Sequence, residues 1–164
     1  MNISRQIAGY LKSRELVLAS IETCTAGTIT AALADLPGAV VCLDVGIVAH
    51  TRRALAELPG ASVALQADER VTESLARALA EALLVQRTGH ASVTLASIGW
   101  FDAQEASAAH CFAWACRDGD AVFSANETVL FSGRRAEVRR SIVRRALLGL
   151  PRFVDSVFAR ERAG

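Results

Sequence analysis

Three short apolar runs alternate with helix-like segments over the first hundred residues, and this alternation constrains the fold more than any other feature of the chain. The apolar runs cover residues 16–21, 40–49 and 91–98. Apolar residues recur at helical spacing over residues 3–13, 25–36, 51–58 and 72–88. Strands that alternate with helices form parallel sheets covered by helices on both faces. We therefore expect a three-layer α/β/α domain.

The last third of the chain adds a hairpin and a long helix. Asp118-Gly119-Asp120 separates two strand-like segments, residues 110–117 and 121–131, and Asp-Gly between strands is a strong hairpin signal. A helical pattern then begins at Arg135, and Pro151 is expected to end it, with a short helical segment after it. The predicted sheet is mainly parallel with a C-terminal antiparallel hairpin, and the whole chain is expected to form a single domain.

Composition excludes several classes of protein. Hydrophobic residues make up 52% of the 164 residues, enough for a core that needs no metal or disulfide. The four cysteines lack zinc-ligand spacing, and we expect Cys42, Cys111 and Cys116 to be small buried side chains. No apolar run reaches the roughly 20 residues of a membrane-spanning helix, and the first twelve residues lack a signal-peptide pattern. A cytoplasmic protein without membrane association is expected.

Charge is distributed unevenly along the chain. Residues 134–162 carry nine arginines and three acidic residues, a net of +6, whereas residues 1–133 carry a net of −5. Such a basic helix could bind nucleic acid. However, its arginines lie opposite the apolar stripe, where any surface helix carries charge, and no aromatic side chain interleaves with them. Nucleic-acid binding is therefore the least favoured hypothesis. The arginines in question are Arg135, Arg139, Arg140 and Arg144.

The richest candidate site is the turn between the first predicted strand and its helix, Glu22-Thr23-Cys24-Thr25-Ala26-Gly27. It offers four polar side chains in a row, and Ala26-Gly27 allow close approach of the backbone. The free N–H groups at the start of the following helix suit a phosphate or a carboxylate. The alternative is simple capping of the helix by Thr23 or Thr25.

A second candidate site is His50-Thr51-Arg52-Arg53, at the end of the second predicted strand. His50 could act as a general base, and the two arginines could hold an anion. Alternatively, Thr51 caps the next helix and the arginines are solvated. His90 follows a helix-ending glycine and His110 begins a strand, so neither is expected in a site, and the three histidines have no metal-ligand spacing.

With these motifs in place, the chain resembles the C-terminal domain of the CinA (competence/damage-inducible) proteins, which also occurs as a stand-alone nicotinamide mononucleotide amidohydrolase. The resemblance covers roughly residues 3–150. Family members carry Glu-Ser-Cys-Thr-Gly-Gly where this chain has residues 22–27, and further motifs agree in order and spacing. These are Ala34-Asp35-Leu36-Pro37-Gly38-Ala39, Val71-Thr72-Glu73, Phe112-Ala113-Trp114-Ala115, Phe131-Ser132-Gly133-Arg134-Arg135 and Val138-Arg139-Arg140.

The resemblance implies hydrolysis of a carboxamide, which converts nicotinamide mononucleotide to nicotinate mononucleotide and ammonia. By this resemblance Thr23 would supply the hydroxyl and His50 the base, while Arg135 and Arg139 would contact the phosphate or act structurally. The family chemistry implies no metal and no cofactor. Family members are often dimers, so a homodimer or higher homo-oligomer is expected. The other residues expected to bind substrate are Glu22, Cys24, Thr25, Gly27 and Thr51.

The positions that would carry catalysis depart from the family pattern. The family's serine is Thr23 here, its tyrosine is His50 and its lysine is Leu55. A leucine can neither bind a substrate amide nor shuttle a proton, and Lys12 is the only lysine of the chain. The family's Thr-Gly-Ile-Ala-Gly-Pro loop corresponds to residues 96–101, which read Ala-Ser-Ile-Gly-Trp-Phe.

These departures leave several hypotheses open. Trp100 and Phe101 would fill space that a nucleotide otherwise occupies, or they could be buried against a second copy of the chain. Thr23 and His50 could form a new hydroxyl–imidazole pair, and Cys24 offers another nucleophile. The alternative to an enzyme is a catalytically silent protein of the same fold that binds a nucleotide or related anion, or acts in assembly.

Overall fold

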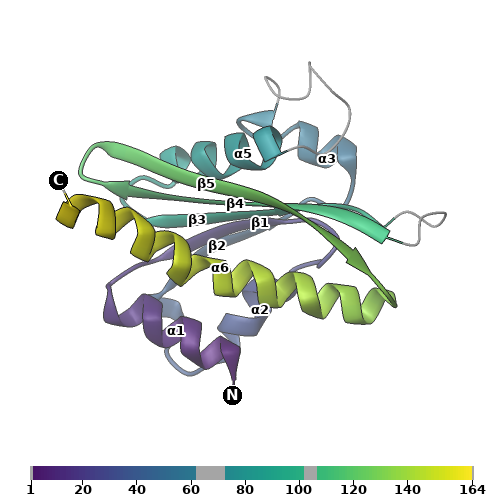
Figure 1. The fold of residues 1–164 in the computed structure, drawn as a ribbon, viewed down its shortest axis with the longest axis horizontal. Coiled ribbons are helices and arrows are strands. Elements are labelled where there is room, and N and C mark those ends of the chain that lie inside the picture. The colour runs from purple at the N-terminus through teal and green to yellow at the C-terminus, as the bar shows by residue number, and fades with distance from the viewer. Residues whose placement is uncertain (1, 62–72, 102–106, 164) are drawn as a thin grey trace.

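The computed structural model, which describes residues 2–61, 73–101 and 107–163, has three layers. A five-stranded sheet lies between two sets of helices, as Figure 1 shows. This architecture confirms the predicted α/β/α fold. In chain order the elements are α1 (Ile3–Ser13), β1 (Leu18–Glu22), α2 (Thr28–Ala34), the 3₁₀ turn η1 (Ala39–Val41), β2 (Leu43–Val48), α3 (Arg52–Ala56), α5 (Glu73–Gln86), β3 (Val93–Ile98), β4 (Ser107–Asp118), β5 (Ala121–Ser132) and α6 (Arg135–Ala163).

The strands are ordered β2-β1-β3-β4-β5. β2, β1 and β3 run parallel, whereas β4 and β5 are antiparallel and form the predicted hairpin. Glu22 at the end of β1 pairs with Val48 of β2 on one side and with Ser97 of β3 on the other. The carboxyl ends of the three parallel strands therefore meet at one edge, where both candidate sites are found.

Two predicted boundaries in the second strand region change. The apolar run from residue 40 does not begin a strand, because Gly38 (φ 78°) starts the turn η1, whose Val40 and Val41 are largely exposed. β2 begins only at Leu43. The next helix begins at Arg52, with Thr51 as its N-cap. The expected cap Thr72, and residues 62–70 of the expected loop, lie outside the described residues.

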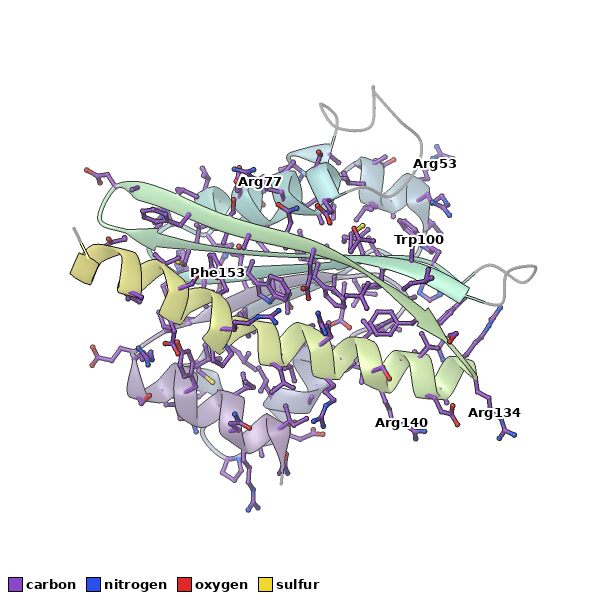
Figure 2. The ribbon with its side chains drawn as sticks, viewed as in Figure 1. Arg53, Arg77, Trp100, Arg134, Arg140 and Phe153 are labelled. Atoms are coloured by element: carbon purple, nitrogen blue, oxygen red, sulfur yellow. The ribbon has the colours of Figure 1, made fainter. Side chains whose placement is uncertain are left out.

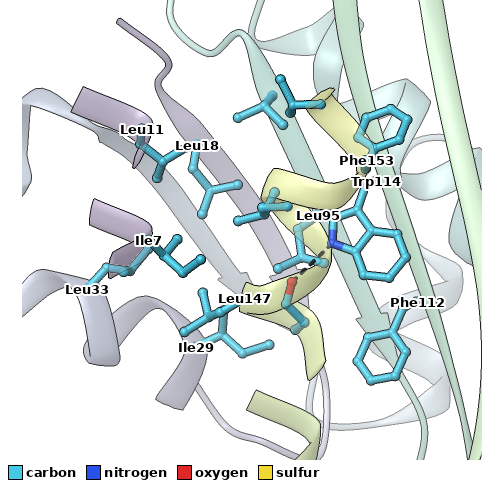
Figure 3. Close-up of a cluster of buried hydrophobic side chains, with 14 of the residues drawn as sticks. Ile7, Leu11, Leu18, Ile29, Leu33, Leu95, Phe112, Trp114, Leu147 and Phe153 are labelled. Atoms are coloured by element: carbon cyan, nitrogen blue, oxygen red, sulfur yellow. Dashed lines mark hydrogen bonds between the residues drawn. The ribbon is translucent and has the colours of Figure 1, made fainter. Parts of the chain in front are cut away.

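Two apolar cores lie on the two faces of the sheet. α1, α2 and α6 cover one face, and α3 and α5 cover the other. Figure 3 shows the first core, where Trp114 Nε1 donates to the carbonyl of Ala146 at 3.1 Å. A Cβ at Gly149 would overlap the Trp114 ring, so α6 packs on this indole only through a glycine. The described helices include none with the length and apolarity to cross a membrane.

The predicted end of the last helix at Pro151 is wrong. α6 continues through Pro151 to Ala163. A proline inside a helix costs about 3 kcal/mol. Beyond it, Phe153, Val154 and Val157 are all buried, and burying each such side chain contributes about 1.5–3 kcal/mol. The tertiary contacts therefore outweigh the local cost. As expected, the cysteines at 42, 111 and 116 are buried.

Candidate functional site

The turn between β1 and α2 folds back on itself through two consecutive left-handed residues. Ala26 has a φ of 53° and Gly27 a φ of 93°. The left-handed conformation costs an alanine roughly 1–2 kcal/mol, so other contacts must hold the turn in place. Those contacts come from the buried side chain of Glu22, which wraps under the start of α2.

Glu22 is fully buried and accepts hydrogen bonds from the residues that begin α2. Its Oε1 accepts from Thr25 Oγ1 at 2.6 Å, from the Gly27 amide at 2.8 Å and from the Ile29 amide at 3.2 Å. Its Oε2 accepts from the amide and the hydroxyl of Thr30 at 3.3 and 3.4 Å. The anion bound at this helix start is therefore a carboxylate of the chain itself.

Thr23 is fully buried, and its hydroxyl is bonded in both directions to one peptide unit. Thr23 Oγ1 donates to the carbonyl oxygen of Gly99 at 2.6 Å and accepts from the Gly99 amide at 3.0 Å. These two hydrogen bonds tie the turn to the end of β3. The hydroxyl hydrogen, which a general base would have to remove to activate Thr23 as a nucleophile, is already donated to the Gly99 carbonyl oxygen.

Cys24 belongs to a buried chain of polar side chains that crosses the sheet edge. Its Sγ lies 3.9 Å from His110 Nδ1, and His110 Nε2 shares a 2.7 Å hydrogen bond with Ser97 Oγ. Burial raises the pKa of the Cys24 thiol to about 11, and burial lowers the pKa of His110 to about 3. At neutral pH the pair is therefore a thiol beside an uncharged imidazole.

These two pKa values decide what the pair can do chemically. The raised pKa of the Cys24 thiol and the lowered pKa of His110 both oppose transfer of the proton from Sγ to the imidazole. Catalytic cysteines instead have lowered pKa values beside cations or helix starts. In this geometry the array stabilises a buried imidazole more readily than it activates a thiol.

The second candidate turn contributes mainly to local structure. Thr51 Oγ1 accepts from the Ala54 amide at 3.0 Å and so caps α3, as the alternative hypothesis stated. The Arg52 guanidinium lies 4.5 Å from the Trp100 ring centroid. His50 is exposed, and no hydrogen bond joins it to Thr23 within the part of the chain that the structure describes. Leu55, at the family's lysine position, is buried in the core beside α5.

The arginines of α6 reach the turn from the face of the sheet that α2 and α6 share. Arg139 Nε donates to the carbonyl oxygen of Cys24 at 3.1 Å. The guanidinium groups of Arg135 and Arg139 lie 5.3 and 5.2 Å from the Phe101 ring centroid. Both side chains are thus engaged by Phe101, and Trp100 lies at the same end of the sheet (Figure 2).

The structure thus brings together the turn residues and Arg139, and joins Arg135 to them through Phe101. It adds His110 and Ser97, which sequence reasoning missed. The only available signal was an isolated polar residue at each position within a mainly apolar strand. Among the described residues, no group of three histidine, cysteine or acidic side chains is placed to hold a metal ion.

Comparisons with known proteins agree with this arrangement of elements. The family model of the CinA C-terminal domain matches residues 1–154. A CinA-like protein of Akkermansia muciniphila is 28% identical over 153 residues, which are 91% of this chain and 36% of the relative. A CinA-like protein of Syntrophus aciditrophicus is 38% identical over 94 residues, 57% of this chain and 22% of the relative. The chain therefore matches only about a third or less of the length of these curated relatives.

Solved structures show the same fold. The competence damage-inducible protein A (ComA) of Klebsiella pneumoniae superposes with a TM-score of 0.80 at 21% identity, covering 93% of this chain and 95% of that one. The competence/damage inducible protein CihA of Agrobacterium tumefaciens superposes with a TM-score of 0.76 at 25% identity, covering 92% and 93%.

Proposed function

The chain belongs to the CinA C-terminal domain family, and we propose that it is a catalytically silent member that works by binding a nucleotide or related anion, or by assembly. It would not hydrolyse a carboxamide as the family resemblance implies. The observation that carries the proposal is the burial and hydrogen bonding of Thr23, the residue at the family's serine position.

Thr23 cannot serve as a nucleophile without losing its place in the structure. Its Oγ1 both donates to and accepts from the Gly99 peptide, and the residue is fully buried. To attack a carbonyl carbon, the hydroxyl would have to give up its hydrogen bond to the Gly99 oxygen and become exposed to substrate. Leaving a buried peptide group unpaired costs about 1–3 kcal/mol before any chemistry begins.

The surroundings of Thr23 support the same proposal. Leu55 is packed in the core where the family has a lysine, so no amine is available there to move a proton. Phe101 holds Arg135 and Arg139, the residues that the resemblance implies for phosphate contact.

The test is a measurement of ammonia release from nicotinamide mononucleotide by the purified chain. The proposal expects release at the background rate, both for the wild type and for Thr23→Ala. Ammonia release that Thr23→Ala abolishes would overturn it. If either nicotinamide mononucleotide or nicotinate mononucleotide raised the melting temperature of the chain without turnover, the bound ligand would be a nucleotide. If neither changed the melting temperature, a role in assembly would be favoured.

A second candidate function is carboxamide hydrolysis through Cys24, favoured by the contact between its Sγ and His110 Nδ1. The thiol would have to lose its proton to the imidazole, against the raised pKa of Cys24 and the lowered pKa of His110, before it attacked the amide carbon. Ammonia would then leave, and water would cleave the resulting thioester. The same ammonia assay separates this route from the first, because Cys24→Ala would abolish turnover whereas Thr23→Ala would leave it.

A further inference from the structure

A groove of about 430 Å³ opens between α6, the start of α1 and the start of α2. It lies on the opposite face of the sheet from α5 (Figure 1). Its apolar part is formed by Ile3, Val143 and Leu147. The volume lies within the range typical of small-molecule sites. None of the turn residues 22–27 lines this groove.

Three arginines of α6 surround the apolar part of the groove: Arg139, Arg140 and Arg144. Arg139 is held by Cys24 and Phe101. Arg140 and Arg144 are exposed and have no acidic partner within salt-bridge distance among the described residues. Figure 2 shows Arg140 extending from α6 away from the sheet.

The other arginines of the same helix show that this lack of partners is local. Arg145 and Arg152 both pair with Glu127 of β5, at 2.8 and 3.4 Å. Arg140 and Arg144, in contrast, stand four residues apart on the helix surface, where like charges repel. The helix therefore carries one arginine face that is paired with an acidic residue of the chain and another that is not.

The combination of two free guanidinium groups with an apolar floor narrows the choice of occupant. A second copy of the chain related by a two-fold axis through the groove would bring the two arginine pairs together, which is unfavourable. A nucleic-acid backbone would use the charges but not the floor formed by Ile3, Val143 and Leu147. An anion with an apolar body would use both.

We propose that this groove binds a small organic anion, with a phosphate or carboxylate head held by Arg140 and Arg144 and an aromatic or acyl body lying on the apolar floor. Ser4 and Thr28 also line the groove, and the Thr28 hydroxyl donates to the Thr25 carbonyl oxygen. Guanidinium groups bind phosphates and carboxylates through paired hydrogen bonds. Binding in this groove is independent of whether the turn hydrolyses an amide, so the ammonia assay and the binding assay can fail separately.

The test is isothermal titration calorimetry of the full chain with 1-naphthyl phosphate and with decanoate, as an aryl phosphate and an acyl carboxylate. Inorganic phosphate and 1-naphthol serve as probes of the head and of the body alone. The variants are Arg140→Gln and Arg144→Gln. Arg53→Gln is the matched control, because this exposed arginine lies on α3, across the sheet from the groove.

We expect one of the two amphipathic anions to bind with a one-to-one stoichiometry, and its identity distinguishes an aryl phosphate from an acyl carboxylate source. Each groove variant should weaken binding at least tenfold, which is about 1.4 kcal/mol, whereas Arg53→Gln should change Kd less than twofold. Inorganic phosphate and 1-naphthol should each bind at least tenfold more weakly. Failure of both amphipathic anions to bind at millimolar concentration would overturn the proposal.

Two further outcomes would also overturn it. Unchanged affinity in Arg140→Gln and Arg144→Gln would place the anion elsewhere on the chain. Tighter binding of a 20-base-pair DNA duplex, lost in the same two variants and weakened steeply by salt, would identify the arginine face as a nucleic-acid surface.

Discussion

Removal of the Glu22 carboxylate should destabilise the chain through the start of α2. In Glu22→Ala the amides of Gly27, Ile29 and Thr30 and the hydroxyl of Thr25 lose their acceptor inside the protein. The left-handed Ala26 would then lack the contacts that hold it in this conformation. We expect the turn to loosen and α2 to fray from its first residue.

The magnitude follows from the number and kind of bonds lost. Hydrogen bonds to a charged acceptor contribute about 1.5–3 kcal/mol each, and they are not additive when they share one carboxylate. With water able to reach part of the loosened turn, we expect Glu22→Ala to lower the free energy of unfolding by about 3–5 kcal/mol. Glu22→Gln keeps one acceptor oxygen but turns an NH₂ group toward Thr30, so about 2–3 kcal/mol is expected.

The assay is urea denaturation followed by circular dichroism, with a chemical rescue. Propionate should partly restore the stability of Glu22→Ala, because the truncated side chain leaves space for a carboxylate below the same amides. Glu57→Ala, which removes an exposed carboxylate at the end of α3, is the control and should change stability by less than about 0.5 kcal/mol.

Two results would refute this reasoning. A loss below about 1 kcal/mol in Glu22→Ala would show that the hydrogen bonds to Glu22 do not stabilise the turn. A loss of the expected size, with propionate stabilising the wild type and the variant equally, would show that the ion acts through the solvent rather than at the start of α2.

Three other predictions concern His110, its neighbour Gly99, and Pro151. Burial lowers the pKa of His110 to about 3, so below about pH 6.5 the unfolded chain binds a proton that the folded chain does not. The free energy of unfolding should therefore fall by up to about 1.4 kcal/mol per pH unit as the pH drops from about 6 to about 4. In urea titrations at these pH values, His110→Leu should lose this part of the pH dependence. Gly99→Ala, whose new Cβ would overlap His110 Nδ1, should cost about 1–3 kcal/mol in the wild type and at most half of that in His110→Ala, as measured by a double-mutant cycle. Pro151→Ala should raise the free energy of unfolding by about 2 kcal/mol, since it relieves a cost of about 3 kcal/mol in the helix and removes a smaller restriction of the unfolded chain; no gain in the melting temperature would contradict the account of α6.

The fold was predictable where one face of an element decides its structure locally. α1 begins and ends as predicted, because Ile7 and Leu11 repeat at helical spacing and Asn2 caps its start. α6 was predicted too short, because Pro151 acts through local propensity, whereas the burial of Phe153 and Val154 depends on distant elements. Local sequence patterns therefore located the helices, but they could not predict that tertiary contacts outweigh the cost of a proline inside α6.

The candidate site was predictable in place but not in content. Spacing located the turn at the end of β1, because polar residues there follow directly on a buried strand. It could not show that Glu22 fills the start of α2, since this needs a left-handed alanine, which no propensity favours. It also missed His110, which lies 86 residues from Cys24 in sequence and meets it only once the sheet has formed.

His110 also gives a physical reason for two departures in the loop at residues 96–101. By the resemblance, Ser97 stands at a family glycine and Gly99 at a family alanine. Taken alone, the first change buries a hydroxyl and the second removes a side chain from a packed strand end, and both should destabilise. Beside a buried imidazole, however, the hydroxyl of Ser97 is the partner that His110 Nε2 needs, and Gly99 leaves the space that Nδ1 occupies. The three residues therefore form one packed unit, in which Ser97 and Gly99 each fit the buried imidazole of His110.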